Sequence, residues 1–340
     1  MFKNLKETLI IAEVGVNHNS KLKNAFKLID AAKKCGANFV KFQSFKANLL
    51  AKKDTPQVNY QKKNLKSSTS HYTMLKKLEL SFSEQSKLYK YCIKKKIGFI
   101  STPYDIQSAE FLKKLSVKFI KISSADLIDK ILHEKISKLN LPVILSTGMS
   151  SIKEIEQTLK IYKKNKFKKE IALLHCVSNY PCSDSSQNLR AITKLRKKFN
   201  NVVGYSDHSN NKLSSICAVA LGAKILEKHL TLNTKLNGPD HKSSLNPTQF
   251  SEYVQSIRAS ELILGNEKKE CQKEEISMKN ISRKSLYFSK NLHRGSKLCF
   301  DDFIALRPGN GINPMKIDKF INKKLKKDVK KFMILKKELI

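Results

Sequence analysis

The sequence predicts an α/β protein, a (β/α)8 TIM barrel followed by a small C-terminal domain. Short apolar runs alternate with amphipathic segments from the N-terminus to about residue 265, and eight such runs occur. Eight strands, each followed by a helix, are the pattern of a (β/α)8 barrel. The first turn reads GVNHNS, which lacks the Gly-rich GxGxxG pattern typical of the rival doubly wound sheet.

The eight apolar runs have the length of strands that are buried on both faces. They are residues 9–16, 38–45, 97–102, 118–123, 142–147, 171–177, 201–206 and 223–230. Between them, apolar residues recur at helical spacing. The clearest stripes are Leu22, Ala25, Phe26, Ile29 and Ala32; Ile152, Ile155, Leu159 and Tyr162; Leu213, Ile216, Cys217 and Ala220; and Phe250, Tyr253, Val254 and Ile257. Pro247 precedes the last stripe, in a position suited to the first turn of a helix.

The pattern divides the chain into a barrel over residues 1–265, a linker over 266–280 and a small domain over 281–340. The middle stretch is charged and poor in apolar residues, which is typical of a linker. The last segment has short apolar runs and the turn signals HRGSK and RPGNGINP. At about 60 residues it is marginal for an independent core, so we expect it to dock on another surface.

The composition places the chain among globular proteins. Hydrophobic residues make up 40% of the sequence, which excludes general disorder. No apolar run reaches the ~18 residues that a membrane helix needs, and the N-terminus does not resemble a signal peptide. The seven Cys are scattered and form no CxxC pair, so we expect reduced thiols rather than a disulfide framework or a zinc ribbon. We therefore expect a cytoplasmic protein with no membrane partner.

The charge is unusual, because 66 Lys and Arg against 29 Asp and Glu give a net charge of +37. Such a balance suggests a nucleic-acid partner. However, only six of the basic residues are Arg, the residue that nucleic-acid recognition usually recruits, and the Lys are spread over the whole chain. We interpret the excess as a compositional bias and expect no nucleic-acid partner, although nucleic-acid binding stays as a distant alternative.

Polar residues gather at the predicted strand ends, where a (β/α)8 barrel carries its catalytic groups. They are Glu13, Asn17, His18, Lys41, Gln43, Ser101, Thr102, Lys121, Ser123, Ser124, Asp126, Ser146, Thr147, His175, Ser178, Tyr180, Ser206, His208, Glu227 and His229. Buried Lys and Glu are costly unless they are paired or used. A single buried Lys or Glu is as readily explained by a structural ion pair as by a functional role. The whole set at the strand ends indicates a functional site.

The residue types in this set indicate a chemistry. Two Lys and several hydroxyls suit a small anion that carries phosphate and carboxylate. His208 and His229 end the last two strands, and such a pair suits a divalent metal with positions open for water or substrate. The alternative for an isolated His is a hydrogen-bonded polar residue at the barrel rim.

A series of motifs resembles the bacterial sialic acid (nonulosonate) synthase family. In order along the chain they are IIAEVGVNHNS, VKFQSFK, FISTPYD, IKISSADL, VILSTGMSS, LLHCVSNYP, GYSDHS, ALGAKILEKHLTL and GPDHKSSLNP. The segment RPGNGI is similar to the antifreeze-like (SAF) domain that closes these synthases, a small β-clip-like domain. The resemblance covers nearly the whole chain and includes the N-acetylneuraminate and N,N'-diacetyllegionaminate synthases.

The resemblance implies that phosphoenolpyruvate (PEP) condenses with an N-acylmannosamine-type sugar and water to give a nine-carbon α-keto acid and phosphate. It implies a divalent metal on His208 and His229, with Mn²⁺ favoured over Mg²⁺ or Co²⁺. The metal polarises the sugar aldehyde, and Glu13 or Glu227 moves protons, with no ranking between the two. The residues implied for PEP are Lys41, Thr102, Lys121, Ser124, Ser146, Ser178 and Ser206.

The resemblance also implies the sugar ligands, which are Glu13, Gln43, Tyr180 and Asp240, with Asn64 as a further candidate. Arg307 in RPGNG would reach the sugar's N-acyl group from the partner subunit, which makes the enzyme a domain-swapped homodimer. An Arg in a chain so rich in Lys independently indicates a position where the planar guanidinium matters.

Some positions depart from the family pattern. Asp126 stands where some members have Glu, Ser123 where some have Gly and Ser178 where some have Asn, and the loop after Pro181 reads CSDSS. These departures concern the substrate more than the reaction. Pseudaminate synthase is the runner-up within the class, and another PEP-using or metal-aldolase barrel is the alternative outside it.

Overall fold

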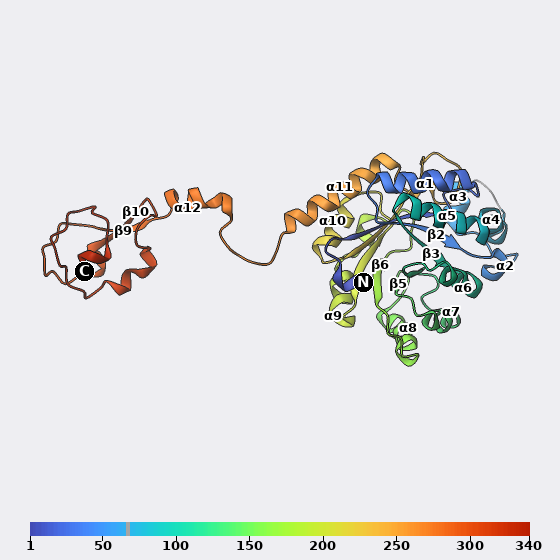
Figure 1. Ribbon diagram of the computed structural model, residues 1–340, viewed down its shortest axis with the longest axis horizontal. Helices are drawn as coiled ribbons and strands as arrows, with labels where there is room; N and C mark the ends of the chain where they lie inside the picture. Colours follow the sequence, from blue (N-terminus) through green and yellow to red (C-terminus); the bar gives the residue numbers. More distant parts are fainter. Residues whose placement is uncertain (66–68) are drawn as a thin grey trace. The chain divides into compact units, whose positions relative to one another are not determined.

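The computed structural model describes residues 1–65 and 69–340 and divides the chain into two compact units, Met1–Gly265 and Asn266–Ile340 (Figure 1). The first unit is a barrel of eight parallel strands. They are β1 (Leu9–Gly15), β2 (Phe39–Ser44), β3 (Gly98–Pro103), β4 (Ile120–Ile122), β5 (Val143–Ser146), β6 (Ile171–Cys176), β7 (Val202–Asp207) and β8 (Ile225–His229). Each begins and ends within two residues of the predicted run, so the predicted (β/α)8 TIM barrel is confirmed.

The strand order is β3-β2-β1-β8-β7-β6-β5-β4, and β3 and β4 lie side by side, which brings the two ends of the sheet together. Helices surround these strands in Figure 1. They are α1 (Leu22–Lys34), α2 (Ala47–Leu50), α3 (Asn59–Leu65), α4 (His71–Leu78), α5 (Phe82–Lys95), α6 (Ile106–Lys114), α7 (Lys130–Ile136), α8 (Ile152–Lys164), α9 (Arg190–Phe199), α10 (Leu213–Ala220) and α11 (Pro247–Leu264). The four predicted helical stripes are confirmed as α1, α8, α10 and α11. Pro247 is the first residue of α11, and Asn246 caps that helix by accepting from Gln249 N.

The inside of the barrel is apolar below its polar upper layer. One buried cluster comprises Phe2, Leu9, Ile11, Phe39, Ile100, Phe119, Ile144, Ala172, Leu174 and Ile225. Gly204 on β7 lies against this cluster, and a Cβ there would come within 2.2 Å of the Ile225 carbonyl oxygen. This close approach of β7 and β8 therefore needs glycine.

Side chains along each strand face inward and outward in alternation, so the inward residues of one strand contribute first to the apolar layer and then to the polar layer. On β1 the inward residues are Leu9 and Ile11, followed by Glu13 at the C-terminal end of the strand. On β8, Ile225 is followed by Glu227. Charged groups thus lie in one layer, at the end of the barrel where the strands finish.

The second unit has a small apolar core of its own. Its strands β9 (Ser285–Phe288) and β10 (Phe303–Leu306) pair antiparallel. The buried residues of this core are Leu286, Phe288, Leu298, Phe303, Leu325, Val329 and Leu335. The stretch 266–280, expected as a linker, contains the beginning of a short helix, α12 (Ile276–Ser282).

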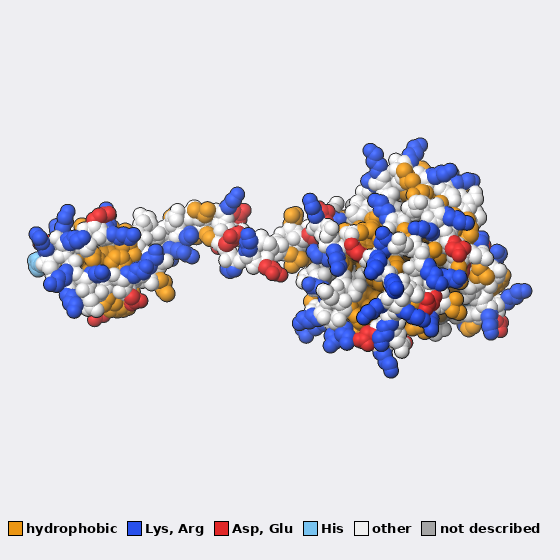
Figure 2. Space-filling model, turned by 60° about the horizontal axis from the view of Figure 1, so that its bottom comes forward, with side chains coloured by type: hydrophobic (Ala, Val, Ile, Leu, Met, Phe, Trp, Pro, Cys, Tyr) orange, Lys and Arg blue, Asp and Glu red, His pale blue; other side chains and the backbone are white. Residues whose placement is uncertain are grey.

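The surface carries the charge excess in a dispersed form. In the view of Figure 2, Lys and Arg side chains are scattered over both units among apolar and acidic ones. In the residues that the structure describes, no helix is long and apolar enough to cross a membrane.

Candidate active site

The candidate site is the polar layer inside the barrel, and its centre is a buried cluster of two Lys and two Glu. Lys41 Nζ on β2 lies 3.2 Å from Glu13 Oε2 on β1 and 3.4 Å from Glu227 Oε1 on β8. Lys121 Nζ on β4 lies 3.6 Å from the same Glu227 oxygen. All four side chains are almost entirely buried. The cluster thus joins residues that are distant in sequence across the barrel interior.

Hydroxyl groups form hydrogen bonds with this cluster. Lys41 Nζ donates to Thr102 Oγ1 on β3 at 3.2 Å, and Ser206 Oγ on β7 donates to Glu227 Oε1 at 3.1 Å. The other oxygen of Glu227, Oε2, and the hydroxyl of Ser146 on β5 are buried without a hydrogen-bond partner among the described residues. Buried polar atoms are normally paired, so these two are candidate contacts for a polar ligand.

The two carboxylates differ in protonation. Burial alone would raise the pKa of Glu227, but Lys121 and Lys41 outweigh it and hold that pKa at about 2. Burial raises the pKa of Glu13 to about 7, because Lys41 compensates only in part and the charge of Glu227 opposes ionisation. Near neutral pH the cluster therefore contains one fixed carboxylate and one that exchanges a proton, which is the arrangement expected of an electrostatic group beside an acid or base.

His208 and His229 lie together at the rim of this layer, with ring centroids 5.6 Å apart. The Nδ1 of His208 bonds the carbonyl oxygen of Val177 at 2.8 Å. Its Nε2 has only a long contact with Ser206 Oγ, at 3.5 Å, among the described residues and can therefore turn to a ligand. The Nδ1 of His229 is buried and has no hydrogen-bond partner among the described residues. Burial, followed by the charge of His208, holds the pKa of His229 well below its usual range, so its imidazole is neutral, as metal binding requires. Burial would also lower the pKa of His208, but Cys176 outweighs it and raises that pKa, so a metal would displace a proton from His208.

This donor set fits a metal held by two imidazoles. Among the described residues, no group of three His, Cys, Asp or Glu side chains forms a metal cluster. The remaining coordination positions would therefore belong to water and substrate, as in a catalytic rather than a structural site.

The ends of β4, β5 and β6 meet around Gly148. Gly148 N donates to Ser124 Oγ at 3.0 Å, and a Cβ on Gly148 would lie 2.4 Å from Ser178 Oγ and 2.8 Å from Ser124 Oγ. The glycine is needed here because two side chains converge on its Cα. The structure thus brings together the two hydroxyls that sequence reasoning had grouped.

The predicted sugar ligands adjoin the cluster in part. Gln43 Nε2 donates to Glu13 Oε1 at 3.3 Å, and the Tyr180 ring lies 4.0 Å from that of His208. Asp240 is buried, and burial raises its pKa to about 6. Asn64 bonds the carbonyl oxygen of Pro239, next to Asp240, at 2.6 Å. Arg307 directly follows β10 and belongs to the second unit, Asn266–Ile340.

Two residues of the site were missed by sequence reasoning. Cys176 is the inward residue that ends β6, and its Sγ lies 3.7 Å from His208 Nδ1. The signal for Cys176 was its spacing from Leu174, because residues two apart on a strand face the same side and Leu174 faces the interior. His175, named instead at this strand end, faces outward, where its Nε2 bonds the Gln187 carbonyl oxygen at 2.7 Å. Tyr60 on α3 carried no comparable signal.

Tyr60 extends the aromatic wall of the site. Its ring stacks on Tyr180 with centroids 5.1 Å apart, and its hydroxyl lies 3.5 Å from Asp240 Oδ1. Its position depends on the long connection between β2 and β3. The hydrophobic pattern of the sequence did not predict the helices in this connection.

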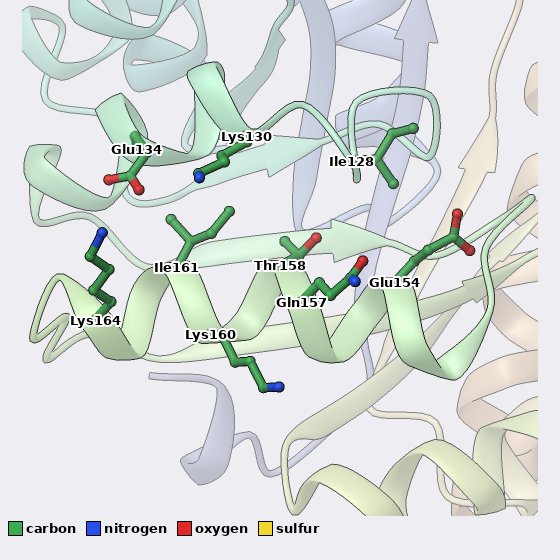
Figure 3. A pocket seen from close by; sticks show the side chains of 9 residues that line it. All are labelled: Ile128, Lys130, Glu134, Glu154, Gln157, Thr158, Lys160, Ile161 and Lys164. Atoms are coloured by element: carbon green, nitrogen blue, oxygen red, sulfur yellow. The ribbon is translucent and has the colours of Figure 1, made fainter.

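A groove of about 410 Å³ lies elsewhere on the barrel unit, between α7 and α8 (Figure 3). Its walls are Ile128, Lys130, Glu134, Glu154, Gln157, Thr158, Lys160, Ile161 and Lys164. None of the strand-end residues lines it, so we assign the chemistry to the barrel interior.

The sequence profile of the NeuB family matches residues 28–269, which is more than half of the chain. The protein belongs to the NeuB family. Among its relatives, an N,N'-diacetyllegionaminic acid synthase of Campylobacter jejuni is 41% identical over 327 residues, 96% of this chain and 98% of its own. A pseudaminic acid synthase of the same organism is 31% identical over 97% of this chain and 95% of its own.

Solved structures agree with this membership in the NeuB family. An N-acetylneuraminic acid synthetase of Leptospira borgpetersenii, crystallised with citrate, superimposes with a TM-score of 0.70 and 34% identity. The match covers 80% of this chain and 90% of that one. The motif resemblance stated above is thereby confirmed.

The raised pKa of Glu13 predicts a pH-dependent stability. In the folded state the pKa is about 7, against an ordinary value of 4.5, so the folded protein binds the proton more tightly. Glu13 therefore destabilises the fold increasingly as the pH rises from about 4.5 to about 7. We expect Glu13→Gln to gain stability relative to wild type over this window, measured by urea unfolding at a series of pH values.

The control is made in the Glu13→Gln background, because the charge of Glu227 itself helps to raise the pKa of Glu13. With a folded pKa of about 2 and an ordinary value of 4.5, Glu227 is ionised in both states above about pH 5.5. Adding Glu227→Gln to Glu13→Gln should therefore change the stability by an amount that does not vary with pH between about 5.5 and 7. A flat profile for Glu13→Gln, or a pH-dependent effect of Glu227→Gln in that background, would contradict the assignment of the proton to Glu13.

Proposed function

We propose that the protein is a nonulosonic acid synthase. It condenses PEP with the open-chain aldehyde of an N-acylmannosamine-type sugar, adds water and releases phosphate. The observation that carries the proposal is the buried cluster of Lys41, Lys121, Glu13 and Glu227 beside a pair of His in a NeuB-family barrel. We also propose that it acts in the cytoplasm.

Lys41 and Lys121 are suited to the phosphate and carboxylate of PEP, together with the hydroxyls of Thr102, Ser124, Ser146, Ser178 and Ser206. Two buried ammonium groups would attract a small anion strongly, because water screens them little. Within residues 1–65 and 69–340, the hydroxyl of Ser146 and Oε2 of Glu227 have no hydrogen-bond partner, so these polar groups are available to a ligand or its bound water.

A divalent ion on His208 and His229, Mn²⁺ in preference to Mg²⁺ or Co²⁺, would supply Lewis-acid polarisation of the sugar aldehyde. The enol carbon of PEP forms the new bond to the aldehyde carbon, and the aldehyde oxygen takes up a proton. Water then adds to the cationic carbon of the former enol and gives up one proton. The C–O bond to phosphate breaks with its electron pair leaving on the phosphate, and the new hydroxyl gives its remaining proton to that phosphate as it becomes the keto group. Glu13 is suited to these proton transfers, since its pKa is about 7. Glu227, which stays ionised, stabilises the positive charge.

The sugar is most simply a 2,4-diacetamido-2,4,6-trideoxymannose, which gives N,N'-diacetyllegionaminate. The support is the 41% identity to a synthase named for that product, against 31% to a pseudaminic acid synthase. N-acetylmannosamine, which gives N-acetylneuraminate, is the alternative substrate. Gln43, Tyr180, Asp240 and Asn64 are the barrel residues proposed to bind the sugar.

The unit Asn266–Ile340 is proposed as an SAF domain, with residues 281–340 forming the domain proper. Its Arg307 would complete the sugar site of a partner subunit, which makes the enzyme a domain-swapped homodimer. The guanidinium suits the acyl oxygen of the sugar, because its donors are fixed in one plane.

The first test of this function is phosphate release from PEP with each candidate sugar, with and without Mn²⁺. We expect release only with an N-acylmannosamine-type sugar and Mn²⁺. His208→Ala and His229→Ala should each lower kcat by about a hundredfold or more, as when a principal source of charge stabilisation is lost. His293→Ala is the control, since that side chain is 91% exposed in the other unit. Release with a sugar phosphate but no free sugar would point to another PEP-using barrel.

The second test concerns Arg307 and the swapped dimer. Arg307→Ala should raise the KM for the sugar but not the KM for PEP, and Arg294→Ala, an exposed Arg of the same unit, should change neither. When Arg307→Ala and His229→Ala subunits are refolded together, mixed dimers should regain activity, because one site then has both residues. Absence of any regained activity in verified mixed dimers would argue against the swap.

A further inference from the structure

We propose that Asp207 and Lys228 are a positioning pair that fixes His208 and His229 at the spacing a divalent metal requires. This inference rests on the metal site of the proposed function. Asp207 directly precedes His208, and Lys228 directly precedes His229. Because side chains alternate along a strand, the pair lies on the outer face of the sheet while the two His face the interior.

The pair is completely buried between the sheet and the helices outside it. Lys228 Nζ lies 3.0 Å from Asp207 Oδ2, and the two side chains are 1% and 0% exposed. The same carboxylate oxygen accepts from Ser215 Oγ on α10 at 2.8 Å, and Ser215 Oγ accepts from Tyr253 on α11 at 2.8 Å. The ends of β7 and β8 are thus tied to each other and to two helices.

The remaining bonds of the pair close around His208. Asp207 Oδ1 accepts from Ser209 N at 2.8 Å and from Ser209 Oγ at 2.7 Å. Lys228 Nζ donates to the carbonyl oxygen of Ser209 at 2.6 Å. The residues before and after His208 are therefore both attached to the residue before His229.

The backbone alone gives His208 less support. The register between β7 and β8 ends with Asp207 opposite Lys228, so His208 lies beyond the last backbone rung. Its carbonyl oxygen accepts from Cys182 N at 2.8 Å, on the side away from β8. On the side of β8, the backbone hydrogen bonds between the strands end before His208. There the side chains of Asp207 and Lys228 connect the two strands instead.

Stability is a weak explanation for such a pair, because apolar residues of similar size often replace buried ion pairs without loss. A better explanation for the pair is that its directional hydrogen bonds hold the ends of β7 and β8 in a fixed relative position. Metal ligands need a fixed separation, and residues that support them commonly change the metal affinity when they are replaced.

The test uses the full-length protein freed of metal, titrated with Mn²⁺ by calorimetry and with Co²⁺ by visible absorption. Lys228→Met and Asp207→Asn should each bind Mn²⁺ about 10–100-fold more weakly, with an altered Co²⁺ spectrum and a native circular dichroism spectrum. Lys228→Arg, which retains the charge, should bind more tightly than Lys228→Met. Tyr253→Phe is the matched control, since it loosens the same network but leaves the pair intact. It should lower Tm without changing the metal affinity or the Co²⁺ spectrum.

The outcomes separate this inference from the function on which it rests. If the wild-type protein binds neither ion, the proposed metal site and the positioning pair both fail. If wild type, Lys228→Met and Asp207→Asn bind equally well with one Co²⁺ spectrum, the pair only stabilises the fold and the proposed function stands. Should Lys228→Met not fold, the isosteric Asp207→Asn makes the same test.

Discussion

The ammonium group of Lys41 is the group on which the rest of the site depends. It lies inside the barrel between Glu13 and Glu227, and a buried charge without a partner would not be tolerated there. Its presence requires carboxylates on β1 and β8. Burial raises the pKa of Glu13, whereas the charges of Lys121 and Lys41 outweigh burial at Glu227 and lower its pKa. One buried ion cluster therefore carries both the proposed anion site and the proposed proton exchange.

The apolar layer beneath the cluster makes this arrangement possible. Inward residues such as Ile11 and Ile225 fill the lower barrel, and the next inward residues of the same strands are Glu13 and Glu227. A rigid base keeps water out and fixes where the charged groups lie. This division explains why much of the site was predictable, since strand boundaries and parity alone specify which residues reach the interior.

What could not be predicted depends on contacts outside that alternation. The sequence prediction named His175 rather than Cys176, because it took the polar residue at the strand end without considering which residues of that strand face the interior. Tyr60 comes from the long β2 to β3 connection, where neither period nor capping signal gave its position. Asp207 and Lys228 have the sequence pattern of ordinary strand residues, and their pairing depends on contacts on the outer face of the sheet. The proposed role of Arg307 involves a second subunit, and the sequence of one chain does not specify where such a subunit would lie.

The central claim is that the Lys cluster holds PEP beside a metal on the two His. A crystal of the protein with PEP and Mn²⁺, measured at the Mn absorption edge, tests it most directly. The account predicts an anomalous peak between Nε2 of His208 and the imidazole of His229, with the PEP phosphate or carboxylate on Lys41 and Lys121. A peak away from both His, or PEP bound apart from both Lys, would contradict it.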